Sequence, residues 1–417
     1  MLEIVTQSAQ ESQDLKLTLD ALALQGARKL LIEALHQEVA QYVGAAKEER
    51  DSAGRAQVVR NGTARPRKVT LGCGTIEVSA PRVHDKRPEK KFTSSILPPY
   101  LKRSQNVEEL LPVLYLKGLS TSDFQEALVG ILGEGAGGLS SSSISSLKRA
   151  WEQDFEHWKA QLINDQFVYV FADGVHVKVR LGEDKKLCLL VIIGVTAQGE
   201  KKLIAVEPGH RESTESWSIV LRDLKSRGLK APMLAIGDGA LGFWSAVRAV
   251  FPSTHEQRCW VHKIANVLDA LPKRLQVTAK SLLHEMMYAD TEADANEALQ
   301  RFDVAFGLKH PKSVEKLKKD WDELTTLFKF PAAHWKHIRS TNPIESTFAT
   351  VKLRTKVTKG AGSPKAATTM AFKLMIDAQK RWRKISGVEE ITRLLNGVAY
   401  KDGVVVPAKS DQEAVNS

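Results

Sequence analysis

The sequence is poor in cysteine and has no long apolar run. Its three cysteines, Cys73, Cys188 and Cys259, lie far apart, which excludes a disulfide framework and a four-cysteine zinc site. The longest apolar run, residues 187–195, is much shorter than the ~20 residues of a membrane helix and is typical of a buried strand. Residues 1–20 are polar and acidic, without a signal-peptide core. We therefore expect a protein of the reducing cytoplasm with no membrane partner.

Basic residues are in excess. The chain of 417 residues contains 60 Lys and Arg against 49 Asp and Glu, which gives a formal net charge of +11. This surplus favours a polyanionic partner, nucleic acid before an acidic membrane surface. The length suits two or three domains, and a hydrophobic content of 43% is enough for their cores.

The first predicted region, residues 1–104, combines a helix with a basic hairpin. Apolar residues recur at helical spacing over residues 14–43, so this helix needs a partner, either the same domain or a second subunit. A turn-rich basic stretch follows, with a hairpin whose turn is at residues 72–74. Any single cation here is typical of a solvated linker, but their clustering favours phosphate contact. The candidate contacts are Arg60, Arg65 and Arg67.

Three short helices are predicted in residues 105–160. The first covers residues 108–116 and the second residues 121–128, and the third begins after the serines at 140–143. The third helix carries Lys148 and Arg149, which we assign as DNA contacts. The pattern resembles a helix-turn-helix module, although any three-helix packing element has the same pattern.

From residue 165 the pattern becomes α/β. We expect three antiparallel strands, then a helix, a strand, a helix and a last strand. The strands are expected at residues 167–172, 175–181, 187–196, 234–236 and 254–258, and the helices at residues 212–228 and 243–251. The order matches a ribonuclease-H-like fold. We predict a catalytic domain from residues 165–258 and 336–400, an all-α insertion at 259–335 and a tail at 401–417.

Three carboxylates are the candidate catalytic residues. Asp173 and Asp238 each follow an apolar strand, and Glu345 begins a later helix. Phosphoryl transfer on DNA uses two divalent ions about 4 Å apart, and Mg²⁺ (or Mn²⁺) prefers such oxygen ligands. Each residue also has an ordinary structural interpretation. Both Asp-Gly pairs are typical of turns, and Glu345 suits a capping box with Asn342 as N-cap.

Several segments resemble the Mutator type of bacterial insertion-sequence transposases, within the DDE superfamily. The matching segments are Asp173-Gly-Val-His-Val-Lys-Val-Arg180, Gly237-Asp-Gly-Ala-Leu-Gly-Phe243, Gln257-Arg-Cys-Trp-Val-His-Lys263 and Thr341-Asn-Pro-Ile-Glu-Ser346. The resemblance implies that Asp173, Asp238 and Glu345 form the DDE triad and hold two metal ions. It also implies binding to terminal inverted repeats, cleavage at the element ends and joining to target DNA. Because two ends must be paired, a homodimer on DNA is expected.

Residues around the predicted triad complete the candidate site. We assign Lys178, Arg180, Lys352, Arg354 and Lys356 to DNA contact. Cys259 and His262 are half of a possible metal site with His255, but no other cysteine is spaced to complete it. We therefore assign Cys259, Trp260 and His262 to the active-site wall or the DNA path, with a packed cysteine and a hydrogen-bonded histidine as the alternative. For Trp260 and Trp335, base stacking and core packing both remain open, and for Trp244 packing is favoured.

Two other functions fit the same pattern. A ribonuclease-H-like nuclease would cleave DNA without joining it. A non-catalytic DNA-binding regulator would keep the basic regions but would not need the three carboxylates.

Overall fold

A computed structural model describes residues 18–117, 119, 123–132, 141–180, 186–239, 241–357 and 360–407. The chain forms two compact units, Met1–Leu147 and Lys148–Ser417, which we treat separately. The glycine-rich segment 133–138, the end of the predicted tail at 408–417 and the start of the first predicted helix at 14–17 lie outside the described residues. No helix in the described parts is long and apolar enough to span a membrane.

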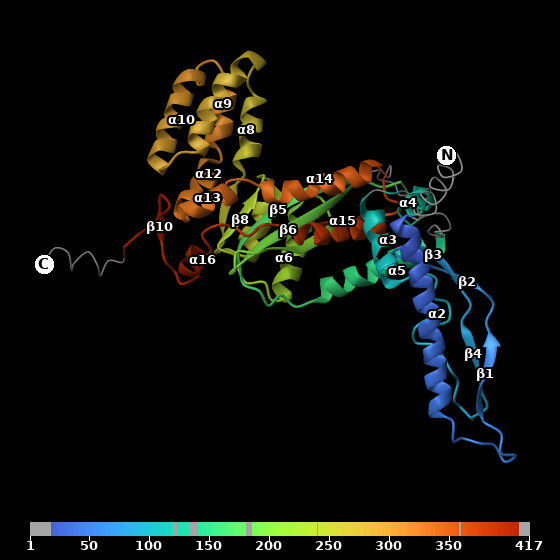
Figure 1. The fold of residues 1–417 in the computed structure, drawn as a ribbon. Helices are drawn as coiled ribbons and strands as arrows, with labels where there is room; N and C mark the ends of the chain where they lie inside the picture. The colour runs from blue at the N-terminus through green and yellow to red at the C-terminus, as the bar shows by residue number, and fades with distance from the viewer. Residues whose placement is uncertain are drawn as a thin grey trace, which may run out of the picture. The chain divides into compact units, whose positions relative to one another are not determined.

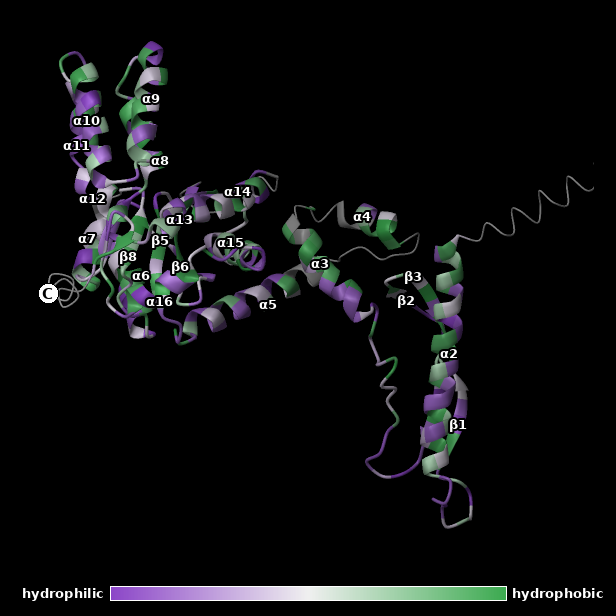
Figure 2. Cartoon of the chain, turned by 60° about the vertical axis from the view of Figure 1, so that its left-hand side comes forward, coloured by the Kyte–Doolittle hydropathy of each residue, from purple (hydrophilic) through white to green (hydrophobic). Residues whose placement is uncertain are grey.

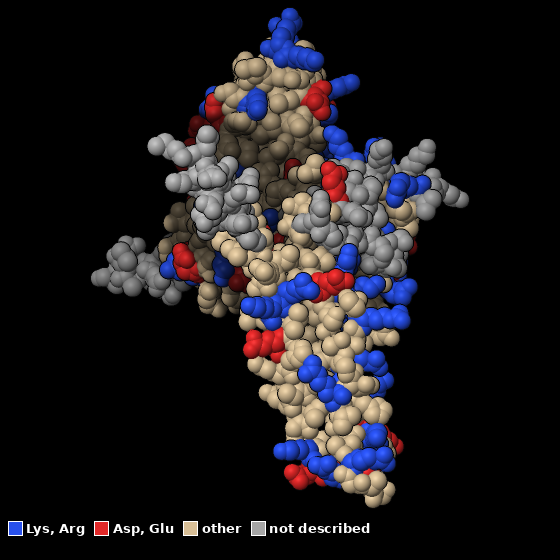
Figure 3. Space-filling model, turned by 45° about the vertical axis from the view of Figure 1, so that its right-hand side comes forward, with Lys and Arg blue, Asp and Glu red and all other residues tan. Residues whose placement is uncertain are grey.

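The first helix that the structure describes in the N-terminal unit is α2 (Leu19–Ala45), which packs on the predicted hairpin. Strands β2 (Arg67–Leu71) and β3 (Gly74–Val78) pair antiparallel, with Leu71 opposite Gly74, so this hairpin prediction is confirmed. A second antiparallel pair joins β1 (Val58–Thr63) to β4 (Pro81–Asp85). The core under α2 consists of Leu35, Val69, Ile76, Val78 and Leu97. On the face drawn in Figure 3, Lys and Arg side chains are scattered over this part among uncharged residues, with some Asp and Glu between them.

Three helices follow, as predicted. They are α3 (Gln105–Lys117), α4 (Asp123–Leu132) and α5 (Ser141–Ala160). Helices α3 and α4 pack through Val107, Leu111, Leu128 and Leu132. The chain divides between Leu147 and Lys148, within α5, and in the second unit Phe155 of this helix packs against Phe372.

A five-stranded mixed sheet forms the centre of the second unit (Figure 1). Its strand order is β7-β6-β5-β8-β9. Strand β6 is antiparallel to β5 and β7, whereas β8 is parallel to both β5 and β9. The strands are β5 (Phe167–Lys178), β6 (Lys186–Thr196), β7 (Lys201–Pro208), β8 (Leu234–Gly237) and β9 (His255–Arg258).

The first two strands predicted in this unit form a single strand, β5, in the structure. Residues 167–172 and 175–178 both belong to β5, and Asp173 pairs with Val191 inside the ladder, so the turn predicted at Asp173-Gly174 is wrong. The alternation after Gly174 reflects one strand whose His176 and Lys178 side chains become exposed, rather than a second strand. The third antiparallel strand is β7, which the sequence analysis did not identify.

Helices cover both faces of the sheet. Helices α6 (Thr214–Ser226) and α7 (Leu241–Val250) pack on one face through a core that includes Trp217, Leu224, Phe243 and Val247. Helices α14 (Asn342–Val357) and α15 (Pro364–Gln379) lie over the other face (Figure 1). The central strands are strongly hydrophobic, as Figure 2 shows, which is typical of a sheet buried on both sides.

Between β9 and α14 the chain is helical. Helices α8 (Trp260–Leu268), α9 (Lys273–Met287), α10 (Glu292–Phe306) and α11 (Pro311–Lys318) pack together, and α12 (Trp321–Thr325) and α13 (Ala332–Ile338) lead back to the sheet. After α15 come helix α16 (Val388–Leu395) and a small pair of strands, β10 (Tyr400–Lys401) and β11 (Val404–Val405).

Candidate active site

Asp173 and Asp238 lie at equivalent positions on neighbouring parallel strands. Phe171 of β5 pairs with Ile236 of β8, and each aspartate lies two residues beyond that pair. Because the strands run in the same direction, both carboxylates lie at the same level of the sheet, just beyond the last β5–β8 pair. Asp173 is buried and Asp238 is partly buried.

The two aspartates share one arginine. The guanidinium group of Arg211 forms an ion pair with Asp238, and its Nε lies 3.7 Å from Asp173 Oδ1. The Arg211 backbone is held by Trp217, whose indole N–H donates to the Arg211 carbonyl oxygen at 2.8 Å. Arg211 was not among the residues predicted from the sequence, because its place ahead of α6 carries no local signal of an approach to two distant strands.

Burial and charge act in opposite directions on Asp173. Burial raises the pKa of its carboxyl above the ordinary value, against the opposing effect of Arg211. Gly174 permits the close approach of Arg211, because a Cβ at this position would lie 3.1 Å from the arginine side-chain carbons. The site therefore combines two carboxylates in a poorly solvated place with a cation between them.

A second arginine supports the loop that carries Asp238. Gly239 has a φ of +92°, and the Arg258 guanidinium occupies the space that a Cβ would need there. Arg258 in turn forms an ion pair of 2.8 Å with Asp320, which also pairs with Lys263 at 2.6 Å. These contacts connect the end of β8 to the segment just before α12.

Glu345 lies in the first turn of α14, which begins at Asn342. The carbonyl oxygen of Thr341 accepts the first helical hydrogen bonds, from the N–H groups of Ile344 and Glu345. The Thr341 hydroxyl donates to Glu345 Oε1 at 2.7 Å. The residue that contacts Glu345 is thus Thr341, not the predicted N-cap Asn342. The Glu345 side chain is 35% exposed.

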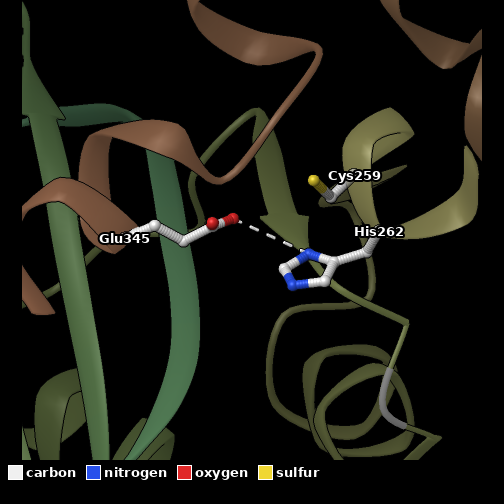
Figure 4. A group of neighbouring side chains, drawn as sticks. All are labelled: Cys259, His262 and Glu345. Carbon is white, nitrogen blue, oxygen red and sulfur yellow. Dashed lines mark ion pairs between the residues drawn. The ribbon is translucent and has the colours of Figure 1, made fainter. Parts of the chain in front are cut away.

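Cys259 and His262 face Glu345 from the start of α8 (Figure 4). His262 Nδ1 lies 3.8 Å from Glu345 Oε1, and the Thr341 N–H donates to Cys259 Sγ at 3.3 Å. Burial raises the pKa of the Cys259 thiol, but hydrogen bonds with His262 and Thr341 outweigh it, so the pKa is lowered. The hydrogen bond with Cys259 raises the pKa of His262 despite its burial. His255, the third ligand considered from the sequence, is not in this group among the described residues.

The tryptophans near the site are buried. Trp260 has no exposed surface, and its indole N–H donates to the Leu324 carbonyl oxygen at 3.0 Å. The indole N–H of Trp335 donates to the Phe330 carbonyl oxygen at 2.8 Å, and Trp244 packs against Phe243. Core packing, rather than base stacking, is therefore what these three residues do in the structure.

The candidate DNA contacts differ in exposure. Exposed side chains are those of Arg60, Arg65, Lys148, Arg149, Lys178, Arg180, Lys352 and Lys356. Arg67 is half-buried and donates to the Leu97 and Pro98 carbonyl oxygens. Arg354 is only 2% exposed, because it lies on the face of α14 that packs inward. Because its side chain is buried, Arg354 is not placed to contact DNA as predicted.

Comparisons with known proteins agree on one family. A family model described as "Transposase, Mutator family" matches residues 2–385. The chain is 50% identical over 306 residues to the transposase for insertion sequence element IS6120 of Mycolicibacterium smegmatis, covering 73% of this chain and 94% of that protein. It is 46% identical over 281 residues to the transposase for IST2 of Acidithiobacillus ferrooxidans, covering 67% and 95%. The chain therefore belongs to the Mutator family of transposases.

Proposed function

We propose that this transposase cleaves and joins DNA through a DDE centre made of Asp173, Asp238 and Glu345. The observation that carries the proposal is the meeting of Asp173 and Asp238 on Arg211, just beyond the last residue pair of the parallel strands β5 and β8. Glu345 is near enough to Asp173 for its charge to raise the pKa of that carboxyl. Three acidic groups from distant parts of the chain thus face one region.

The donor set suits hard divalent cations. Asp173 and Asp238 offer carboxylate oxygens, which Mg²⁺ and Mn²⁺ prefer, and the Arg211 guanidinium between them shows that the pair accommodates positive charge. We infer that Asp173, Asp238 and Glu345 would hold two ions. When bound, the ions would activate the attacking water or 3′-hydroxyl and stabilise the leaving oxygen.

The protein's own residues bind and orient the DNA. Lys352 is exposed on α14, seven residues after Glu345 and therefore on the same side of the helix. Lys178 and Arg180 are exposed at the end of β5 that carries Asp173. These cations are suited to phosphate oxygens next to the carboxylates, where they would fix the strand that reacts. Cys259 and His262 line the side of the site that Glu345 faces.

The sheet supports a ribonuclease-H-like core. Three antiparallel strands followed by two parallel ones, in the order β7-β6-β5-β8-β9, put the first strand at the centre with an aspartate on it. We propose a catalytic domain from residues 165–258 and 336–400, interrupted by an insertion at 259–335 and followed by a tail at 401–417. Residues 1–104 would serve dimerisation and DNA contact, and residues 105–160 would act as a helix-turn-helix-like module. The partners would be terminal inverted repeats and target DNA, bound by a homodimer.

The proposal is tested with Asp173→Asn and Asp238→Asn. Each variant removes a carboxylate charge at nearly constant volume, so we expect cleavage of an end-containing duplex in Mg²⁺ to fall at least ~1,000-fold, equivalent to several kcal/mol. Binding of the same duplex, measured by gel shift, should persist. Full cleavage by both variants would contradict the proposal.

A strand-transfer assay distinguishes joining from cleavage alone. Pre-cut 3′ ends are incubated with target DNA and Mg²⁺, and joined products are mapped to the nucleotide. We expect joined products from the unmodified chain and none from Asp238→Asn. Cleavage without joining would instead identify a nuclease, and an unmodified chain that neither cleaves nor joins DNA would have only a DNA-binding role.

A further inference from the structure

A thiol, an imidazole and a carboxylate converge beside the two aspartates. Cys259 Sγ, a ring nitrogen of His262 and a carboxylate oxygen of Glu345 all lie within 4.8 Å of one another. Cys259 directly precedes α8, His262 lies in the first turn of α8, and Glu345 lies in the first turn of α14. In Figure 4 the three side chains point toward a common space. The Thr341 hydroxyl lies next to them, 3.3 Å from Cys259 Sγ and 2.7 Å from Glu345 Oε1.

The donor types distinguish this group from the aspartate pair. Sulfur and imidazole nitrogen are ligands that Zn²⁺ prefers, whereas an all-carboxylate set selects Mg²⁺. Zinc takes ligands at about 2.0–2.3 Å in a tetrahedron, which places ligand atoms about 3.5 Å apart. The 3.8 Å between His262 Nδ1 and Glu345 Oε1 is close to that spacing, so small side-chain rotations suffice.

The surroundings are also those of a zinc site. Cys259 is completely buried, which protects the sulfur from solvent, while the side chains of His262 and Glu345 are 33% and 35% exposed and leave an entry path. The Thr341 N–H donates to Cys259 Sγ, and such outer contacts orient metal ligands. Three protein ligands with one open position are the usual number for an accessible zinc ion.

We propose that Cys259, His262 and Glu345 form a binding site for one Zn²⁺ ion, separate from the Asp173–Asp238 pair. Binding engages Glu345, so zinc withdraws that carboxylate from the two aspartates and opposes loading of the centre with Mg²⁺. This regulatory consequence rests on the proposed function, but the binding of zinc does not.

The test measures zinc binding to the full-length chain without DNA or Mg²⁺. Zn²⁺ is titrated in competition with a chromophoric chelator, and one tightly bound ion per chain is expected. Cys259→Ser and His262→Ala should each weaken binding at least ~100-fold, since loss of even an outer-shell partner costs 10–100-fold. Glu345→Gln should weaken it as well.

Matched controls lie elsewhere in the same chain. Cys73→Ser changes a half-buried free cysteine, and His255→Ala changes an exposed histidine four residues before Cys259, so both should bind zinc like the unmodified chain. Circular dichroism shows whether each variant folds. Co²⁺ bound to the unmodified chain should give a sulfur-to-cobalt charge-transfer band, which requires no variant.

Two results would overturn the inference: a cobalt complex without that band, or equal zinc affinity in Cys259→Ser and Cys73→Ser. Because no DNA is present, these results are independent of the cleavage assays. A chain that cleaves DNA but binds no zinc would refute this site alone, and a chain that binds zinc but never cleaves would refute only the DDE centre.

Discussion

Arg211 places a guanidinium group between two carboxylates of neighbouring strands. Removal of one partner from a buried ion pair is costly, because the other charge is left without compensation. Here the arginine side chain is 29% exposed, so solvent reduces that cost. A divalent ion bound by Asp173 and Asp238, as proposed above, would compete with Arg211 for the space between the two carboxylates.

Replacement of Arg211 by alanine should therefore separate its contribution to stability from its competition with a metal ion. Without divalent ions, we expect the free energy of unfolding to fall by about 1–3 kcal/mol. With Mg²⁺, the variant should gain more thermal stability than the unmodified chain, because the ion no longer displaces a guanidinium group. Differential scanning fluorimetry across a Mg²⁺ series measures both. Arg222→Ala, an exposed arginine on α6, is the control, and equal Mg²⁺ shifts in all three proteins would refute the competition.

Gly239 is the other residue on which the site depends sterically. Its φ of +92° strains any L side chain, and an added Cβ would displace the Arg258 guanidinium. We expect Gly239→Ala to lower the free energy of unfolding by about 1–3 kcal/mol in urea titrations. Gly362→Ala, where a Cβ meets no atom within 4 Å, should change it by less than about 0.5 kcal/mol. A similar effect of both substitutions would show that the loop after β8 adapts.

Individual elements show where local patterns mislead. Strand β5 was predicted as two strands because an Asp-Gly pair is a common turn and the exposure pattern changes after it. In the structure β6 supplies a partner to every residue of β5 from Tyr169 to Lys178, so the ladder continues through the pair. Pairing with a long neighbour overrides the turn preference of two residues.

Helix α13 carries a histidine that the fold keeps neutral. Burial lowers the pKa of His337 to about 4, and the Ser386 N–H donates to its Nε2 at 3.0 Å, which requires an unprotonated nitrogen. The ordinary value of 6.5 applies to the unfolded chain, which therefore binds the proton first as the pH falls. The stability that His337 contributes is complete above pH 6.5 and is lost between about pH 6.5 and 4.

We expect His337→Asn to reduce this pH dependence. The asparagine side chain accepts the Ser386 N–H without titrating, so the urea midpoint of the variant should fall less between pH 7 and pH 4.5 than that of the unmodified chain. Replacement of His157, an exposed histidine on α5, is the comparison and should leave the dependence as it was. Parallel pH profiles for the unmodified chain and His337→Asn would contradict the assignment.

At the scale of the whole molecule, the positive charge is spread over both units. Exposed cations occur on the N-terminal strands and at the ends of β5 and α14. In contrast, Arg354 is buried, and the half-buried Arg67 donates a hydrogen bond to a backbone carbonyl oxygen. Net charge alone therefore overestimates the cations available to phosphate groups. Affinity for DNA should follow the exposed ones and should fall with salt, because phosphate contacts release counterions.

The double variant Lys352→Ala/Lys356→Ala tests this at the proposed site. Each lost phosphate contact lowers the slope of log affinity against log salt by about 0.9, so the slope should become shallower by nearly 2. Fluorescence anisotropy with an end-containing duplex at several salt concentrations measures it. Lys230→Ala is the control, since this exposed lysine precedes β8, at the opposite end from Asp238. An unchanged slope in the double variant would place the DNA elsewhere.

Local patterns in the sequence determined a good deal about this protein. The N-terminal helix, the N-terminal hairpin, the strand before Asp238 and the helical segment before Glu345 follow from periodicity and turn residues, because these signals depend on near neighbours. The order of the strands around Asp173 was predicted wrongly, because two predicted strands are one and β7 was not predicted. The segments that resemble known transposases, rather than periodicity, indicated the family that the comparisons show.

Only the tertiary structure decided what meets at the site. Sheet order brings β5 next to β8, so Asp173 and Asp238 converge on Arg211, which lies 38 residues after Asp173 and 27 residues before Asp238. The start of α14 brings Thr341 and Glu345 to Cys259, more than eighty residues before Glu345. The physical reason is that burial and pairing between distant segments determine these contacts, and no local periodicity records which distant segments will pack together.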